Sequence, residues 1–220
     1  MKIIFTFLVL FNFTNNIFSQ DNIALKIVEK PINYNKERQD LSIEYLKTRH
    51  GIIQNTPVIK SKFIVLHYTA GGTIISNFNY FNNVKIENSR KINKDKSILN
   101  VSAHYLIDRD GTIYHLIADT LFARHTIGLN YCAIGIENIG SKTEPLTHQQ
   151  IIANASLIRY LSGKYKIDYV IGHSEYTKFK NTPLWKETNK SYITYKEDPG
   201  AIFLVEVRKL IKGLNLKDKP

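Results

Sequence analysis

Two histidines in this sequence each close a short apolar run, a position from which an imidazole can do chemistry. His67 ends FIVLH (63–67) and His173 ends YVIGH (169–173). The β-branched and aromatic residues of both runs predict buried strands. If the two strands are neighbours in one sheet, both imidazoles project from the same edge, where open α/β sheets build their sites. A lone histidine is more often a hydrogen-bonded structural residue, but a matched pair favours a shared metal site.

Asp198 is the carboxylate that would complete this site. Two imidazoles and one carboxylate form a donor set of catalytic zinc, with a fourth position left for water. The sequence has neither an HExxH motif nor a Cys-x-x-Cys pair, so the ligands have to come from distant segments. Asp198 also precedes Pro199 at the expected start of the last helix, where an N-cap is the alternative role. A carboxylate has enough lone pairs for both roles.

The elements that must position these residues are those of one α/β domain. The chain has 220 residues with 43% hydrophobic content, which is enough for one sizeable core. Alternating strands and helices predict an α/β domain built on a mixed sheet. We expect helices over 35–50, 73–83, 147–163 and 198–211, strands over 63–67, 132–140 and 169–173, and a hairpin around 108–111.

Several segments lie outside these elements. Residues 84–100 are polar and predict a surface loop, and residues 174–197 form an irregular excursion rich in Lys and Tyr. Asp108 and Asp110 lack the rest of a calcium loop's spacing, so we expect them to act as turn residues. The expected organisation is a signal peptide at 1–20, an N-terminal helical extension at 21–59, the main domain at 60–213 and a C-terminal tail at 214–220.

The N-terminus has the pattern of a signal peptide. Lys2 is followed by the apolar run IIFTFLVLFNF, which is too short to span a bilayer. We therefore expect an exported protein, periplasmic or secreted, with no transmembrane segment after signal removal; an uncut anchor is the alternative. Cys132 is the only cysteine and cannot form an internal disulfide, so core packing or a metal has to hold the fold. We expect its thiol to be buried.

The net charge of +11 favours an anionic partner. The lysines are scattered, and no basic run interleaves with aromatic residues as it would on a nucleic-acid surface. An anionic wall polymer or a membrane surface is therefore expected rather than nucleic acid. 

Five segments together resemble a known family. FIVLHYTA, SAHYLIDRDGTIYHLI, ARHTIGLNYCAIGIENIG, YVIGHSE and KEDPG occur in this order and are similar to the N-acetylmuramoyl-L-alanine amidase type 2 family, which is related to peptidoglycan recognition proteins and phage-lysozyme amidases. The resemblance covers about residues 60–212. It implies a mixed central β-sheet flanked by helices, with a zinc site in a surface groove at the sheet edge, where the peptide stem of peptidoglycan binds.

The resemblance also implies roles for individual residues. The family's zinc ligands fall on His67, His173 and Asp198. Its catalytic acid lies in the IGIE strand and falls on Glu137, and its catalytic lysine, two residues before the aspartate, falls on Lys196. The implied cofactor is Zn²⁺, and the implied reaction is hydrolysis of the amide bond between N-acetylmuramic acid and L-alanine.

The sequence differs from one branch of the family at Ala103, and its segment 174–197 is unusually long. The phage-type branch has a tyrosine where this chain has Ala103, so the chain resembles the glutamate-bearing branch. The excursion 174–197 is longer than is common in the family, but a long surface insertion costs little closure entropy and can still return Asp198 to the site. Within it, Trp185 and Tyr192 could line the groove, with a packed flap as the alternative.

The remaining histidines divide into two groups. His104 and His125 are candidates for contacts with the substrate or with the metal ligands, with structural roles as the alternative. His50, His115 and His148 are expected to be surface or packing residues. The expected partner is peptidoglycan or a muropeptide, and we expect a monomer. The alternative function is a recognition module that binds peptidoglycan without cutting it.

Overall fold

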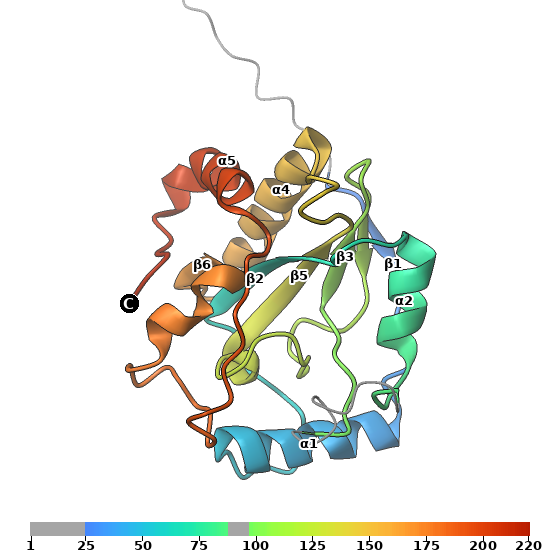
Figure 1. Cartoon of the computed structure of the whole chain (residues 1–220), viewed down its shortest axis with the longest axis vertical. Helices are drawn as coiled ribbons and strands as arrows, with labels where there is room; N and C mark the ends of the chain where they lie inside the picture. The colour runs from blue at the N-terminus through green and yellow to red at the C-terminus, as the bar shows by residue number, and fades with distance from the viewer. Residues whose placement is uncertain (1–24, 88–96) are drawn as a thin grey trace, which may run out of the picture.

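The computed structural model describes residues 25–87 and 97–220, and this part of the chain is built on a single mixed sheet (Figure 1). Its strands are β1 (Ile27–Glu29), β2 (Phe63–Tyr68), β3 (Tyr105–Ile107), β4 (Ile113–His115), β5 (Ala133–Asn138) and β6 (Tyr169–Gly172). Across the sheet their order is β1-β4-β3-β5-β2-β6. The β3–β4 hairpin is antiparallel and the other neighbouring pairs are parallel, which confirms the predicted mixed α/β fold. The predicted signal peptide lies outside the described residues.

Two helices cover one face of the sheet. α4 (His148–Lys164) and α5 (Ala201–Ile211) lie side by side in Figure 1. They form one buried cluster with alternate residues of the central strands; its members include Ile64, Leu66, Ile134 and Ile136 from the strands, Leu157 and Leu161 from α4, and Phe203 and Val207 from α5. α4 starts at the predicted capping box, in which Thr147 and Gln150 satisfy each other's backbone N–H groups.

The opposite face carries the intervening strand positions. Phe63, Val65, Ala133 and Ile171 pack there against two 3₁₀ segments, η1 (Asn130–Cys132) and η2 (His173–Phe179). Side chains alternate between the two faces of a strand, so His67 follows Phe63 and Val65 onto this second face. Cys132 is a free, buried thiol in the same cluster, as predicted, and burial raises its pKa to about 12.

The helices α1 (Lys36–His50) and α2 (Ile74–Asn82) complete the fold beside this second face. α1 is capped by the Asn35 side chain and ends at Gly51, whose φ of 65° is the left-handed conformation that glycine adopts readily. The buried Arg38 of α1 donates from Nη2 to the carbonyl oxygens of Phe81 and Asn83 at the end of α2, both at 2.8 Å. This contact fixes α2 relative to α1.

The structure differs from the sequence predictions at two places. β1 lies within the segment expected to be a helical extension and pairs in parallel with β4. α5 begins at Ala201 with Gly200 as its N-cap residue, so the predicted N-cap role of Asp198 is wrong. The chain turns at Gly200, where φ is 95°, and this turn separates Asp198 from the helix.

The predicted hairpin turn is confirmed. The Asp108 side chain accepts from Arg109 N at 2.8 Å, and that of Asp110 accepts from Thr112 N at 2.9 Å, which is turn chemistry. In the predicted loop 84–100, Lys85 and Leu99 form an antiparallel bridge, and residues 88–96 lie outside the described part. Within the described residues, no helix is long and apolar enough to cross a membrane.

Candidate functional site

The sheet brings three of the predicted site residues to one place. β2 and β5 run parallel with His67 directly opposite Glu137, so the two side chains stand next to each other on the same face. β6 pairs with the other side of β2 and ends at Gly172, one residue before His173. Both predicted strand ends therefore carry their histidines to one edge, although β2 runs one residue beyond His67.

Asp198 reaches this edge at the end of the excursion 174–197. Ser174 N donates to Asp198 O at 2.9 Å, which closes the base of the excursion beside His173. Higher up, Tyr176 OH donates to Thr194 O at 2.7 Å and accepts from Thr194 N at 2.9 Å. The two halves of the excursion are thus bonded to each other, and the Asp198 side chain is held beside His67 and His173.

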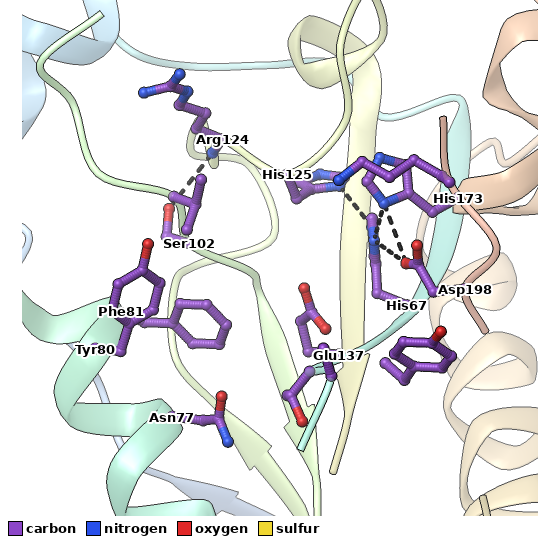
Figure 2. A pocket seen from close by; sticks show the side chains of 15 residues that line it. His67, Asn77, Tyr80, Phe81, Ser102, Arg124, His125, Glu137, His173 and Asp198 are labelled. Carbon is purple, nitrogen blue, oxygen red and sulfur yellow. Dashed lines mark hydrogen bonds and ion pairs between the residues drawn. The ribbon is translucent and has the colours of Figure 1, made fainter. Parts of the chain in front are cut away.

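The three side chains converge on one point (Figure 2). His67 Nδ1 lies 3.0 Å from His173 Nδ1 and 3.2 Å from Asp198 Oδ2, and His173 Nδ1 lies 3.1 Å from Asp198 Oδ2. Zinc bonds of 2.0–2.2 Å at tetrahedral angles put neighbouring ligand atoms about 3.3–3.6 Å apart. The observed spacing is close to this value, so the cluster fits a small divalent metal ion.

The protonation states of the cluster also suit a metal. Burial, followed by the proximity of His67, lowers the pKa of His173 to about 4. Burial alone would raise the pKa of Asp198, but hydrogen bonds from His173 and His67 hold it well below its usual range. At neutral pH His173 is therefore a neutral imidazole and Asp198 an ionised carboxylate, the forms in which these groups bind metals.

Glu137 stands beside the cluster with an unusual carboxyl group. Its Oε2 is buried and has no hydrogen-bond partner within the described residues. Burial raises the pKa of Glu137 to about 7, although a positive charge on His67 would act in the opposite direction. A carboxyl group poised near neutral pH can both take and give a proton, so this residue can act as a general base and then as a general acid.

A cavity of about 370 Å³ opens over the cluster and Glu137, a size within the usual range for ligand sites. Lys196 lines it and influences the pKa of both Glu137 and His173 through its charge. Asn77, Tyr80 and Phe81 of α2 form the opposite wall, across the cavity from the cluster of His67, His173 and Asp198 in Figure 2.

His104 does not reach the cavity. It is fully buried, its Nε2 lies 2.9 Å from Leu121 O, and its Nδ1 accepts from Gly135 N at 3.0 Å. Burial lowers its pKa to about 4. Both ring nitrogens are engaged by the backbone, so His104 has a structural role in this fold.

His125 does line the cavity, and it contacts His67. Its Nδ1 lies 3.1 Å from His67 Nε2, and its Nε2 lies 3.2 Å from Ala133 O. Burial, together with the His67 and His104 rings, lowers its pKa well below 6.5. Gly135 leaves room for this ring. It was not among the predicted site residues, although a glycine inside a strand often marks a close approach.

The other three histidines take the expected packing and surface positions. His50 is buried with Nδ1 2.6 Å from Lys186 O, His115 pairs with Glu29 at 3.0 Å, and His148 is exposed at the start of α4. In the excursion, Trp185 stacks on Tyr176 as part of a packed flap.

Comparisons with known proteins identify the fold and the family. Peptidoglycan recognition protein 3 of Mus musculus is 27% identical over 125 residues, which are 53% of this chain and 35% of that protein, so the match spans about a third of the relative. Two solved structures from Clostridium intestinale, the amidase LysC and the endolysine amidase LysCS, have TM-scores of 0.51 and 0.53 and are each 24% identical, covering 87% of this chain and 99% and 97% of theirs. They share its fold. The family model of N-acetylmuramoyl-L-alanine amidase matches residues 32–201, which is most of the sequence. The chain therefore belongs to the N-acetylmuramoyl-L-alanine amidase family.

Proposed function

We propose that this chain is a zinc-dependent amidase that cuts the bond between N-acetylmuramic acid and L-alanine in peptidoglycan or its fragments. The observation that carries the proposal is the convergence of His67, His173 and Asp198 beside the Glu137 carboxyl group, whose buried Oε2 has no hydrogen-bond partner within the described residues. The family membership supports the same reaction.

The metal site is assigned to the two imidazole nitrogens and the Asp198 carboxylate. A zinc ion held there would lower the pKa of water to about 7 and polarise the substrate carbonyl. The remaining requirements of amide hydrolysis are a group that moves protons and a positive charge near the developing oxyanion. Both are available on the cavity wall.

Glu137 moves the protons. Its Oε2 accepts a proton from the attacking water and delivers it to the departing nitrogen of L-alanine, so the group returns to its ionised form after each cycle. Lys196 places an ammonium group at the same cavity, where it stabilises the negative charge that develops on the carbonyl oxygen. Two of the chain's own charged groups thus serve successive steps.

The setting of the reaction follows from the rest of the sequence. We infer an exported protein, periplasmic or secreted, from the N-terminal apolar run, and the net charge of +11 would concentrate it on anionic cell wall. Peptidoglycan or a muropeptide is the proposed partner, and we propose that the protein acts as a monomer.

The similarity to a peptidoglycan recognition protein favours one alternative, a module that binds peptidoglycan without cutting it. The two functions are separated by incubating the zinc-loaded protein with purified sacculi and with N-acetylmuramoyl-L-alanyl-D-isoglutamine. An amidase releases peptides with a free L-alanine amino group, detected by mass spectrometry. A binding module sediments with the sacculi and releases none, and this result would refute the proposed reaction.

The control variant for this assay is Glu137→Gln, which keeps the size of the side chain and the three metal ligands. It should bind zinc and sacculi like the natural protein and release peptide at least about 100-fold more slowly. If it released peptides at the natural rate, the assigned role of Glu137 would be wrong.

A further inference from the structure

We propose that His125 is a positioning residue that holds His67 in the tautomer whose Nδ1 is free to bind the metal. The inference rests on the proposed function, since it concerns the same metal site. His125 lies outside the cluster of His67, His173 and Asp198, and the proposed reaction does not use it.

The neutral His125 ring carries its proton on Nε2. Its Nε2 lies 3.2 Å from the carbonyl oxygen of Ala133. A carbonyl oxygen only accepts hydrogen bonds, so Nε2 carries the proton of the neutral ring. Nδ1 of His125 is then an acceptor without a proton, and it lies 2.9 Å from Thr126 Oγ1 and 3.1 Å from His67 Nε2.

The tautomer of His125 in turn fixes the tautomer of His67. Its Nε2 lies 3.1 Å from His125 Nδ1 and 3.5 Å from Thr126 Oγ1. Two bare nitrogens at that distance would repel each other, so the proton of His67 belongs on Nε2, where His125 accepts it. The single proton of a neutral ring is thereby used, and Nδ1 presents a lone pair toward His173 and Asp198.

Without His125, the His67 ring would be free to adopt the other tautomer. His67 Nδ1 is also 3.2 Å from Asp198 Oδ2. A ring free to choose would place its proton on Nδ1 and donate it to that carboxylate. In this tautomer Nδ1 cannot bind a metal, and a metal would have to displace the proton first. His125 removes that competition before the metal arrives.

The position of the His125 ring is built into the fold. It lies over Gly135 of β5, where a Cβ atom would be 2.7 Å from Cγ of the ring, so only glycine leaves room for it. Its backbone is fixed as well, because His125 N and Thr126 N both donate to Asn130 Oδ1, at 2.8 and 2.6 Å. The contact with His67 is therefore imposed from two sides of the ring.

Two amide variants separate the acceptor from the rest of the ring. His125→Asn keeps an oxygen near the position of Nδ1, whereas His125→Gln keeps an amide near Nε2 and loses the acceptor. The zinc affinity of each is measured by competition with a chromogenic chelator. We expect His125→Gln to bind zinc about 10- to 100-fold more weakly than the natural protein, the usual effect of losing such a partner. His125→Asn should bind within a few-fold of the natural protein.

A third variant leaves His125 unchanged but fills the space that its ring occupies over Gly135. Gly135→Ala displaces the ring and should weaken zinc binding like His125→Gln. The tautomer itself is read from ¹⁵N shifts and two-bond couplings of the histidine rings in the metal-free proteins. His67 should carry its proton on Nε2 in the natural protein and in His125→Asn, and shift toward Nδ1 in His125→Gln.

The outcomes are distinguishable from failure of the proposed function. If the natural protein binds no zinc, the proposed function falls. If it binds zinc and His125→Gln binds equally well with His67 still protonated on Nε2, the positioning role is overturned and the amidase proposal stands. Circular dichroism of every variant shows whether a loss of affinity comes from unfolding. Unfolding would weaken zinc binding in both His125→Asn and His125→Gln, whereas loss of the acceptor weakens it in His125→Gln alone.

Discussion

Replacing Glu137 with Gln should have opposite effects on activity and on stability. General acid–base catalysis by a positioned group contributes about 10²- to 10⁴-fold, so kcat should fall by about that factor, or about 3 to 5 kcal/mol of transition-state stabilisation. The unfolding free energy of the metal-free protein should instead rise at neutral pH, because the variant no longer buries an ionisable carboxyl group beside Asp198.

The size and sign of the stability change follow from the pKa of Glu137. Burial raises this pKa from 4.5 to about 7. Below pH 4.5 the carboxyl group is protonated in both the folded and the unfolded chain and costs nothing. Between pH 4.5 and 7 the unfolded chain ionises first, so stability falls as pH rises, and the full loss is present above pH 7. The difference corresponds to about 3 kcal/mol, and screening by solvent in the cavity reduces it to about 1–3 kcal/mol.

Urea denaturation of chelator-treated protein at pH 4 and pH 8 measures this difference. Glu137→Gln should be more stable than the natural protein at pH 8 and equal to it at pH 4. Glu44→Gln is the matched control, because Glu44 is exposed on α1, and it should change neither value. A Glu137→Gln protein that is less stable at pH 8, or equally stabilised at both pH values, would refute the reasoning.

Three further predictions concern the metal, the oxyanion and the excursion. His173→Ala should lose both bound zinc, measured by atomic absorption, and amidase activity; full activity without metal would defeat the mechanism. Lys196→Met should keep zinc and lose about 10²- to 10³-fold in kcat in the muropeptide assay, and an unchanged kcat would exclude the oxyanion role. The Arg49 Nη2 to Glu187 Oε1 pair, at 2.7 Å with side chains 11% and 0% exposed, anchors the excursion on α1. Arg49→Met should therefore lower the unfolding free energy by about 3–5 kcal/mol in urea, whereas an effect below 1 kcal/mol would show that the pair is dispensable.

The sequence predicted those elements whose signals are local. α1 and α4 have readable caps at Asn35, Gly51 and Thr147, and their observed bounds agree with the expected ones within two residues. β1 was missed because it has three residues in a polar context and exists through its pairing with β4. Such an edge strand is a product of tertiary structure, which local propensity does not report.

The site was predictable to the extent that its residues sit at strand ends. His67 and His173 close apolar runs, so their shared edge follows from strand adjacency alone. The position of Glu137 opposite His67 is a matter of register, which the family resemblance implied and periodicity did not. The sequence could not distinguish the roles of His104 and His125, because these roles depend on tertiary contacts. The His104 ring is bonded to the backbone of Gly135 and Leu121, whereas the His125 ring lies over Gly135 in the cavity.

The position of Asp198 shows how a long insertion and a precise site can coexist. The proposed role of Asp198 as a metal ligand requires its carboxylate to be placed to within a few tenths of an ångström, which a free loop as long as 174–197 would not achieve. The hydrogen bond from Ser174 N to Asp198 O fixes the two ends of the excursion directly beside His173. Its length beyond that point costs little closure entropy and does not enter the geometry of the cluster. The contacts of Thr188 with Thr48 and Arg49 on α1 then hold the outer part. The hydrogen bond at the base therefore sets the position of the Asp198 carboxylate, and the contacts with α1 hold the rest of the excursion without changing that position.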